Sequence, residues 1–388
     1  MPHARTRHAE ELIKKLAKLW PIIGILGLRQ VGKTTLLKRL EGLIVELISL
    51  DLESYKLDAE RSAQAFLGKL SRPTGIDEIQ KVPSLFDALK WIVDQKRIPG
   101  QFFITGSSAF SSKAGIQESL TGRIGMLQLY PMTLSEIHSQ VLAPLPSVSP
   151  SPKPPRFNTL DFSITMVRGG MPIPCFLRDE DSRSTYWQGW LETTLYRDLS
   201  RVFKGRFDPE LAHSILNEMA KAFREGLRPT LKNFSLDSRK LRKYLEAMEQ
   251  IFLVRRTRCH ELGYGTESWM LGDSGLACSL MEAKEGEGAT LTLVRHCLLN
   301  ELGAIHQYRG KLFPFAYYQG TKGTIIDLFI GRVPVKIVTT AKLNEWDERS
   351  LAACMKRLKV DQGILCAPVD KPTFSKKGIS IVPWTFWS

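Results

Sequence analysis

The 388-residue sequence contains no long hydrophobic run. No apolar stretch approaches the roughly 18 residues that a membrane-spanning helix requires. The segment from Leu19 to Leu28 is too short, contains Pro21 and lacks a small-residue cleavage site, so it does not have the pattern of a signal peptide. We therefore expect a cytoplasmic protein that neither crosses nor binds a membrane.

Cysteine is scarce and never occurs as a closely spaced pair. This pattern fits a reducing compartment and argues against both a disulfide framework and a zinc site. His260, His296 and His306 also lack the spacing of metal ligands. The six scattered cysteines are Cys175, Cys259, Cys278, Cys297, Cys354 and Cys366.

Acidic residues are too few to balance the basic ones, which leaves a net charge of +14. Residues 196–260 contain 15 Lys and Arg against 8 Asp and Glu, so half of this net charge falls in one segment. Such a concentration is typical of a nucleic-acid-binding region. A generally basic protein is the alternative, and an anionic membrane would require an amphipathic anchor that the sequence does not show.

The first 141 residues alternate between predicted strands and helices. This alternation predicts an α/β core with a parallel sheet and helices on both faces. We expect strands at 22–26, 44–52 and 101–105, and helices at 8–19, 34–41 and 85–94.

Six prolines alternate with serines over residues 142–157, which predicts an extended, exposed linker. Three further regions follow it. We expect a helical subdomain at 158–205, a winged helix at 206–275 and a mixed α/β domain at 276–388.

Residues 27–34 match the phosphate-binding pattern G-x-x-x-x-G-K-[ST] in full, between a predicted strand and a predicted helix. The two glycines let backbone N–H groups turn toward phosphates, Lys33 is suited to the β- and γ-phosphates of ATP, and the Thr34 hydroxyl is suited to Mg²⁺. The pattern predicts ATP and Mg²⁺ as cofactors. The predicted nucleotide-binding residues in this loop are Gly27, Arg29, Gln30, Gly32, Lys33, Thr34 and Thr35.

A carboxylate pair, Asp77 and Glu78, provides candidates for the rest of the catalytic chemistry. Asp77 would hold the metal through water, and Glu78 would act as the general base toward the attacking water. The preceding residues are poor strand formers, so an ordinary acidic start of a helix is an alternative. Asp51 and Glu53 are the alternative metal partners.

Three polar residues downstream are further candidates. Thr105 and Ser107 lie at the end of the strand FFIT and are suited to sensing the γ-phosphate, or simply to forming a turn. Arg123 could act as an arginine finger on a neighbouring subunit. An ordinary surface arginine is the alternative.

Seven segments resemble, in order, those of a widespread bacterial and archaeal family of AAA+-related P-loop ATPases. In that family a winged helix and a degenerate restriction-endonuclease-like domain follow the ATPase core. The resemblance implies a ring of subunits, with a hexamer favoured, and supports the roles given to Asp77, Glu78, Ser107 and Arg123. Arg168 and Arg197 match recurring positions, for which we expect buried structural pairing. The segments are GLRQVGKTTLL, IDEIQKVPSLFDALKWIVD, FFITGSS, SLTGRIGMLQLYPMTLSEI, VRGGMP, YRDL and LGDSGLA.

Residues 234–258 show the pattern of a winged helix-turn-helix. Apolar positions share one face of the predicted helix, and basic residues occupy the other face and the following wing strand. Such residues would contact DNA phosphates without reading sequence, while a solvated helix face is the alternative. The predicted DNA-binding residues are Arg239, Lys240, Arg242, Lys243, Arg255, Arg256 and Arg258.

The stretch 301–342 resembles the endonuclease pattern, with Glu301, Asp327 and Lys336 near the expected positions. Pro334 stands where the second metal-binding carboxylate would be, and its absence removes a hard oxygen ligand. We therefore expect no nuclease activity.

These observations favour an ATP-driven motor or remodeller that grips duplex or branched DNA, such as Holliday junctions, through its backbone. The choice of branched DNA rests on family analogy. A nucleotide-dependent switch that assembles protein partners in defence or signalling is the alternative hypothesis.

Overall fold

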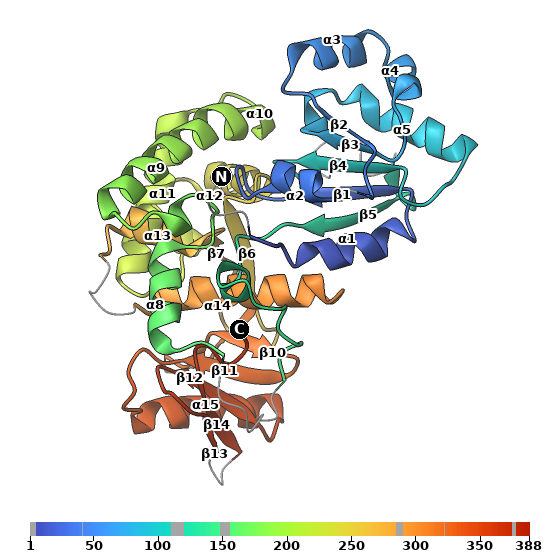
Figure 1. Cartoon of the computed structure of the whole chain (residues 1–388). Helices are drawn as coiled ribbons and strands as arrows, with labels where there is room; N and C mark the ends of the chain where they lie inside the picture. The colour runs from blue at the N-terminus through green and yellow to red at the C-terminus, as the bar shows by residue number, and fades with distance from the viewer. Residues whose placement is uncertain are drawn as a thin grey trace. The chain divides into compact units, whose positions relative to one another are not determined.

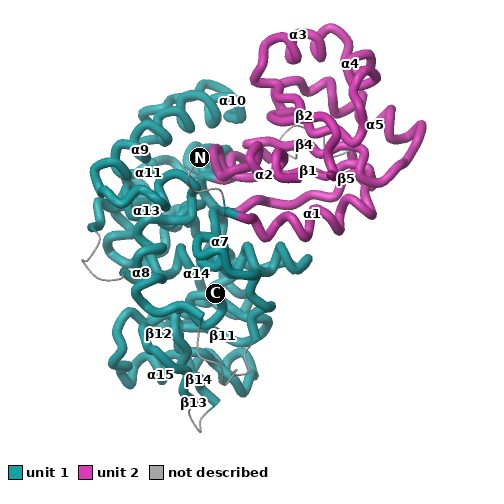
Figure 2. Tube along the Cα trace, viewed as in Figure 1, with its two compact units in different colours: residues 1–5, 131–249, 253–388 teal, residues 6–130, 250–252 magenta. Residues whose placement is uncertain are grey.

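The computed structural model describes residues 5–40, 42–109, 120–147, 156–284, 290–321, 323–374 and 378–388. The chain forms two compact units (Figure 2). We call residues 6–130 with 250–252 the N-terminal unit, and residues 1–5, 131–249 and 253–388 the C-terminal unit.

Five parallel strands form the sheet of the N-terminal unit, in the order β2-β3-β4-β1-β5 (Figure 1). The strands are β1 (Ile22–Leu26), β2 (Glu46–Ser49), β3 (Thr74–Asp77), β4 (Phe102–Gly106) and β5 (Ile124–Gln128). The helices are α1 (Ala9–Ala17), α2 (Lys33–Arg39), α3 (Glu53–Arg61), α4 (Ala63–Lys69), the 3₁₀ turn η1 (Ile79–Lys81) and α5 (Ser84–Gln95).

Strands β1, β2 and β4 overlap the three predicted strand ranges, whereas β5 was not predicted. Every residue of β1 and β4 is buried, as expected for strands that helices cover on both faces. The short strand β3 has weaker strand-forming residues, yet it is also fully buried. Its Gly75 makes room for β2, because a Cβ atom there would lie 2.7 Å from Cδ1 of Leu47. Packing against β2 thus compensates for low strand propensity.

The C-terminal unit is mainly helical up to residue 308, and this part contains an antiparallel hairpin of β6 (Val254–Cys259) and β7 (Ser268–Leu271). Its longer helices are α8 (Thr159–Arg168), α9 (Glu180–Thr193), α11 (Pro209–Arg224), α12 (Ser238–Gln250), α13 (Ser274–Met281) and α14 (Leu291–Tyr308). Its short helical turns are α7 (Leu134–Ile137), η3 (Pro174–Phe176), the π-helix η4 (Thr194–Leu199), α10 (Ser200–Val202) and η5 (Leu231–Asn233).

Two sheets complete the C-terminal unit, in the orders β7-β6-β8-β9 and β10-β11-β12-β14-β13. Helix α15 (Glu345–Leu358) packs on β11 and β12 of the second sheet. The remaining strands are β8 (Ala316–Gln319), β9 (Ile325–Ile326), β10 (Leu328–Ile330), β11 (Val333–Ile337), β12 (Gly363–Ala367), β13 (Thr373–Phe374) and β14 (Ile379–Pro383).

The predicted linker at 142–157 is only partly an exposed connection. Residues 148–155 lie outside the described residues. Before them, Ala143 is buried and its carbonyl accepts hydrogen bonds from Arg309 at 3.0 and 3.1 Å. After them, Phe157 is buried beside His138, with ring centroids 5.2 Å apart. The ends of the segment are therefore packed within the C-terminal unit, and the finer domain boundaries stay predictions.

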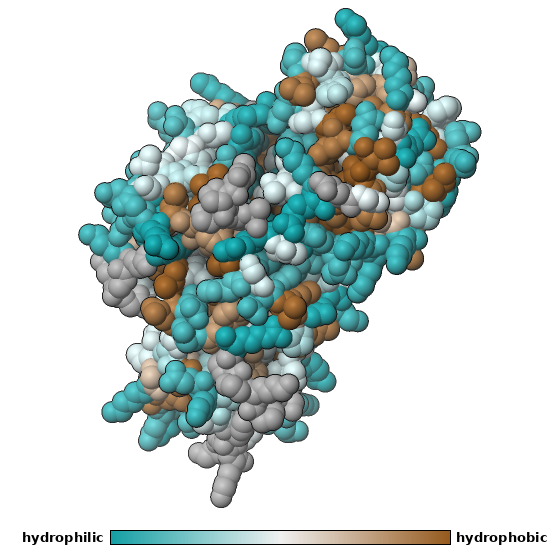
Figure 3. Space-filling view, in the orientation of Figure 1, coloured by the Kyte–Doolittle hydropathy of each residue, from teal (hydrophilic) through white to brown (hydrophobic). Residues whose placement is uncertain are grey.

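Within the described part of the chain, no helix is both long and apolar enough to cross a bilayer. Figure 3 shows hydrophobic side chains in separate areas of one face, interrupted by hydrophilic ones.

Candidate nucleotide site

The predicted phosphate-binding loop connects β1 to α2 within the N-terminal unit. Gly27 and Gly32 have φ angles of 154° and 102°, and a Cβ atom on Gly27 would lie 2.4 Å from the Leu129 carbonyl oxygen. Both positions therefore require glycine. The loop ends at the first turn of α2, where backbone N–H groups attract phosphate.

Lys33 lies inside the loop and is only 4% exposed. Its Nζ donates hydrogen bonds to the carbonyl oxygens of Gly27 at 3.0 Å and Leu28 at 2.8 Å. Thr34 is half-buried beside it, and Thr35 is exposed. Arg29 is half-buried and Gln30 is exposed with a φ of 60° at the turn of the loop.

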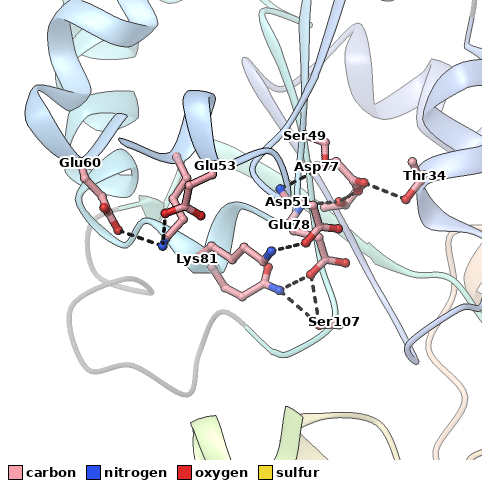
Figure 4. A network of polar contacts seen from close by, with 12 residues as sticks. Thr34, Ser49, Asp51, Glu53, Glu60, Asp77, Glu78, Lys81 and Ser107 are labelled. Carbon is pink, nitrogen blue, oxygen red and sulfur yellow. Dashed lines mark hydrogen bonds and ion pairs between the residues drawn. The ribbon is translucent and has the colours of Figure 1, made fainter. Parts of the chain in front are cut away.

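Asp77 lies at the end of β3, with its side chain toward Thr34 of the loop (Figure 4). The Thr34 hydroxyl donates to Asp77 Oδ2 at 2.7 Å, and the Thr105 hydroxyl donates to Asp77 Oδ1. Burial raises the pKa of Asp77 above its ordinary value, although both hydroxyls act in the opposite direction. The charged carboxylate is thus poorly solvated, which favours a bound cation. Thr34 and Asp77 supply the hard oxygen donors that Mg²⁺ prefers, and they fit this ion.

Thr105 does not have the exposed hydroxyl expected of a γ-phosphate sensor. It is fully buried, and its Oγ1 donates to Asp77 while accepting the backbone N–H of Glu78 at 3.1 Å. Its hydroxyl therefore holds the two carboxylate-bearing residues together. The sequence suggested only sensing or turn formation, because this bonding depends on the neighbouring strand.

Glu78 and Ser107 meet beside Asp77, as Figure 4 shows. The Ser107 hydroxyl donates to Glu78 Oε2 at 3.3 Å. Gln80, which the sequence did not single out, donates through Nε2 to the same Glu78 oxygen and contacts Ser107 Oγ at 3.2 Å. Glu78 itself has a φ of 57°, which turns the chain from β3 into η1.

The alternative metal ligands, Asp51 and Glu53, do not join this cluster. Asp51 forms an ion pair with Lys81 and its side chain is 55% exposed. Glu53 begins α3 and pairs with Lys56 at 3.4 Å. The geometry favours Asp77 over both of them as the partner of Thr34.

Arg123 lies away from the phosphate-binding loop of its own chain. It precedes the first residue of β5, and β5 runs parallel to β1, whose last residue leads into the loop. The length of β1 separates the two, about 16 Å at the usual rise of a strand. Arg123 instead donates to both oxygens of Asp94, at 2.6 and 2.9 Å.

Arg7 supports the loop from outside the recognised motif. It is 5% exposed, and its guanidinium donates to the Val31 carbonyl at 2.8 Å and to the Tyr130 carbonyl at 2.5 Å. No sequence pattern pointed to it, because one arginine in a basic N-terminal segment carries no spacing signal.

The basic residues of the predicted winged helix divide into two groups in the C-terminal unit. Leu241, Tyr244, Leu245 and Met248 are buried on one face of α12. The opposite face is exposed and cationic, and we call it the α12 basic face. It consists of Arg239, Lys240, Arg242 and Lys243, of which Arg242 also pairs with Glu267 at 3.2 Å but stays exposed.

Two of the three predicted wing arginines are engaged inside the unit. Arg256 bonds to Glu249 at 2.8 Å and to Glu267 at 3.2 Å. Arg255 donates to Asn300 at 3.1 Å and stacks over the Phe315 ring. Only Arg258 of the three is exposed. The expectation that all three point to DNA is therefore corrected for Arg255 and Arg256, whose guanidinium groups form intramolecular contacts.

The endonuclease-like residues form ion pairs in place of a metal site. Arg295 and Arg228 contact Asp327 Oδ1 at 3.0 and 3.3 Å, and all three side chains are buried. Burial alone would raise the pKa of Asp327, but the two guanidinium groups outweigh it and lower that pKa. Lys336 lies 3.6 Å from Asp347.

Glu301 occupies a different place, where its Oε2 accepts the backbone N–H of Leu134. Among the described residues, no group of three or more His, Cys, Asp or Glu side chains could hold a metal ion.

Comparison with known proteins assigns the nucleotide-binding region. Residues 20–138 match the family model described as an AAA domain. This part of the chain is similar to AAA-type P-loop ATPase domains. The match supports the predicted P-loop ATPase core and ATPase activity. Residues 159–287 match a domain of unknown function, DUF8612.

Two similar proteins are described only as uncharacterized. Uncharacterized protein Rv2008c of Mycobacterium tuberculosis and uncharacterized protein Mb2031c of Mycobacterium bovis are each 31% identical over 198 residues. This match covers 50% of the present chain and 40% of each relative. The Walker-type ATPase PABY2304 of Pyrococcus abyssi aligns with 70% of this chain and 94% of its own, at 13% identity and a TM-score of 0.41.

Proposed function

We propose that the AAA domain hydrolyses ATP with Lys33, Thr34, Asp77 and Glu78 as its central residues. The observation that carries this proposal is the 2.7 Å contact between the Thr34 hydroxyl and Asp77. It joins the phosphate-binding loop to the carboxylate pair at the ends of two parallel strands, β1 and β3, which lie on either side of β4. In α/β sheets, ligands bind at this edge of the strands. The test is ATP turnover by the purified full-length chain, with and without Mg²⁺.

Each residue has a distinct part in the reaction. Lys33 would exchange its loop carbonyls for oxygens of the β- and γ-phosphates, and Thr34 and Asp77 would hold Mg²⁺. The ion would supply positive charge that stabilises the phosphate groups. Glu78 accepts a proton from water while the water oxygen bonds to the γ-phosphorus and the bond to the β–γ bridging oxygen breaks, which yields ADP and inorganic phosphate. Ser107 orients Glu78.

We further propose that subunits assemble into a ring, with a hexamer favoured, and that Arg123 serves the nucleotide of a neighbour. Its position, separated from its own loop by the length of β1, supports a role between subunits rather than within one. Release from Asp94 would free the guanidinium to stabilise transition-state charge.

Mixing two inactive variants tests this arrangement. Arg123→Ala and Lys33→Ala should each be inactive alone, and mixtures should regain part of the turnover, because an intact finger then meets an intact loop. ATP hydrolysis at several mixing ratios is the measurement, with assembly followed by mass photometry. Assembled mixtures that stay inactive at every ratio would return Arg123 to its structural pairing with Asp94.

The partner that we propose is DNA, held through its phosphates without choice of sequence. The α12 basic face supports this proposal, because four exposed cations lie opposite a buried apolar face. A grip that reads no sequence suits duplex and branched DNA, including Holliday junctions, along which an ATP-driven remodeller would move. The buried ion pairs of Asp327, together with Pro334, support a non-nucleolytic role for the C-terminal sheets.

Replacing Arg239, Lys240, Arg242 and Lys243 together by alanine should weaken binding equally for unrelated DNA sequences. Each lost phosphate contact should reduce the slope of log affinity against log salt by about one unit. Basal ATP turnover should persist, and any stimulation by DNA should fall. Binding to duplex and four-way DNA at several salt concentrations provides the measurement.

A variant with Lys14, Lys15, Lys18 and Lys38 replaced by alanine is the matched control, since these exposed cations carry the same charge on the N-terminal unit. The control should bind DNA as the wild type does. If the wild type, the α12 variant and the control had the same DNA affinity and the same slope of log affinity against log salt, the alternative would be favoured. That alternative is a nucleotide-dependent switch that assembles protein partners.

A further inference from the structure

The carboxylate of Glu78 is held through only one of its two oxygens. Oε2 accepts hydrogen bonds from the Gln80 amide and from the Ser107 hydroxyl. Over the described residues, nothing donates to the other oxygen, Oε1. The two donors therefore fix the direction of the carboxylate and leave one oxygen available to accept a proton.

The orientation of the Gln80 amide follows from this arrangement. An ionised carboxylate only accepts hydrogen bonds, so the NH₂ group of Gln80 must face Glu78. The same NH₂ group lies 3.2 Å from Ser107 Oγ. The amide oxygen of Gln80 is buried and has no hydrogen-bond partner in the described residues. The Gln80 side chain is thus held by its NH₂ end alone, through Glu78 and Ser107.

The backbone brings Gln80 to this position. Glu78 adopts a φ of 57°, and the chain enters η1, so that the side chain two residues later returns to Glu78. A left-handed conformation at a non-glycine residue is costly and occurs often at functional sites. In an ordinary continuation of β3, residues 78 and 80 would also share a face but lie about 7 Å apart along the strand.

We propose that Gln80 is a positioning residue for ATP hydrolysis. Its NH₂ group links Ser107 to Glu78 and keeps the free oxygen of Glu78 directed to the attacking water. This inference rests on the proposed role of Glu78 as general base. Gln80 itself contacts neither ATP nor water in the scheme, so its removal should slow the chemical step and spare nucleotide binding.

Gln80→Leu removes the NH₂ donor and keeps a side chain of similar volume. It should lower kcat by about 10- to 100-fold, within the range of general-base contributions, and leave the affinity for a fluorescent ATP analogue within about threefold. Gln80→Glu should also be slow, because a second carboxylate would repel Glu78. Gln95→Leu, at the exposed end of α5, is the matched control and should behave as wild type.

A double-mutant cycle separates positioning from a general structural effect. If Gln80 acts through Glu78, then Gln80→Leu combined with Glu78→Gln should turn over ATP no more slowly than Glu78→Gln alone. Circular dichroism of each variant checks folding, and Gln80→Glu decides the question if Gln80→Leu unfolds. The inference would be overturned if the double variant were slower than Glu78→Gln by the factor that Gln80→Leu alone causes. It would also be overturned if Gln80→Leu left kcat unchanged or lowered only the affinity for ATP.

The same set of variants distinguishes this inference from the proposed function. If Glu78→Gln turns over ATP at the wild-type rate, the proposed general base is wrong. If Glu78→Gln is slow while Gln80→Leu and Gln80→Glu are as fast as wild type, only the role of Gln80 is wrong.

Discussion

Replacing Lys33 by alanine is expected to reduce ATP binding or turnover to background while the fold stays intact. The ammonium group is buried in the loop, and no other cation in the phosphate-binding motif occupies that position. Without this ammonium group, the loop lacks the main positive charge that binds the β- and γ-phosphates of ATP. ATP hydrolysis and nucleotide binding should be measured together with circular dichroism.

Lys38→Ala is the matched control, because Lys38 is an exposed lysine of the same helix, α2. It should retain wild-type turnover. A Lys33→Ala protein with a normal spectrum and normal turnover would contradict the assignment of the nucleotide site.

The second large effect is expected for Glu78→Gln, which should bind ATP normally and hydrolyse it about 10²-fold more slowly or worse. A glutamine amide has the shape of the carboxylate but accepts no proton from water. Single-turnover hydrolysis and binding of an ATP analogue would separate the two effects.

Asp51→Asn tests the alternative acidic segment in the same assay. Asp51 pairs with Lys81 and is largely exposed, so this change should have little effect on turnover. The reverse pattern, an inactive Asp51→Asn protein and an active Glu78→Gln protein, would move the metal and base roles to the end of β2.

The sequence was informative where a single segment contains all of the chemistry. The loop between β1 and α2 needs two glycines, a lysine and a threonine at fixed spacing, so local pattern and structure agree. β3 was less certain because Pro73 and Gly75 are weak strand formers. Its burial depends on the side chain of Leu47 from another strand, which no local pattern contains.

Residue roles that depend on distant partners could not be predicted in this way. Thr105 was expected either to sense phosphate or to form a turn, but its hydroxyl bonds to Asp77 and to the backbone N–H of Glu78. Likewise, Asp327 matched an endonuclease position, while the arginines that neutralise it come from elsewhere in the chain. Composition identified the charged residues, and only tertiary structure determined which charges face solvent.

Arg7 has a consequence for how nucleotide occupancy could be communicated. Its guanidinium holds the carbonyl of Val31, inside the phosphate-binding loop, and that of Tyr130, the last residue before the chain leaves the N-terminal unit. Leu129, one residue earlier, packs its carbonyl group against Gly27. Its backbone N–H donates to the Leu26 carbonyl oxygen at 2.6 Å. A shift of the loop around a phosphate would therefore also disturb the hydrogen bonds that hold Tyr130. The same few hydrogen bonds that shape the binding loop join it to the residue at which the N-terminal unit ends.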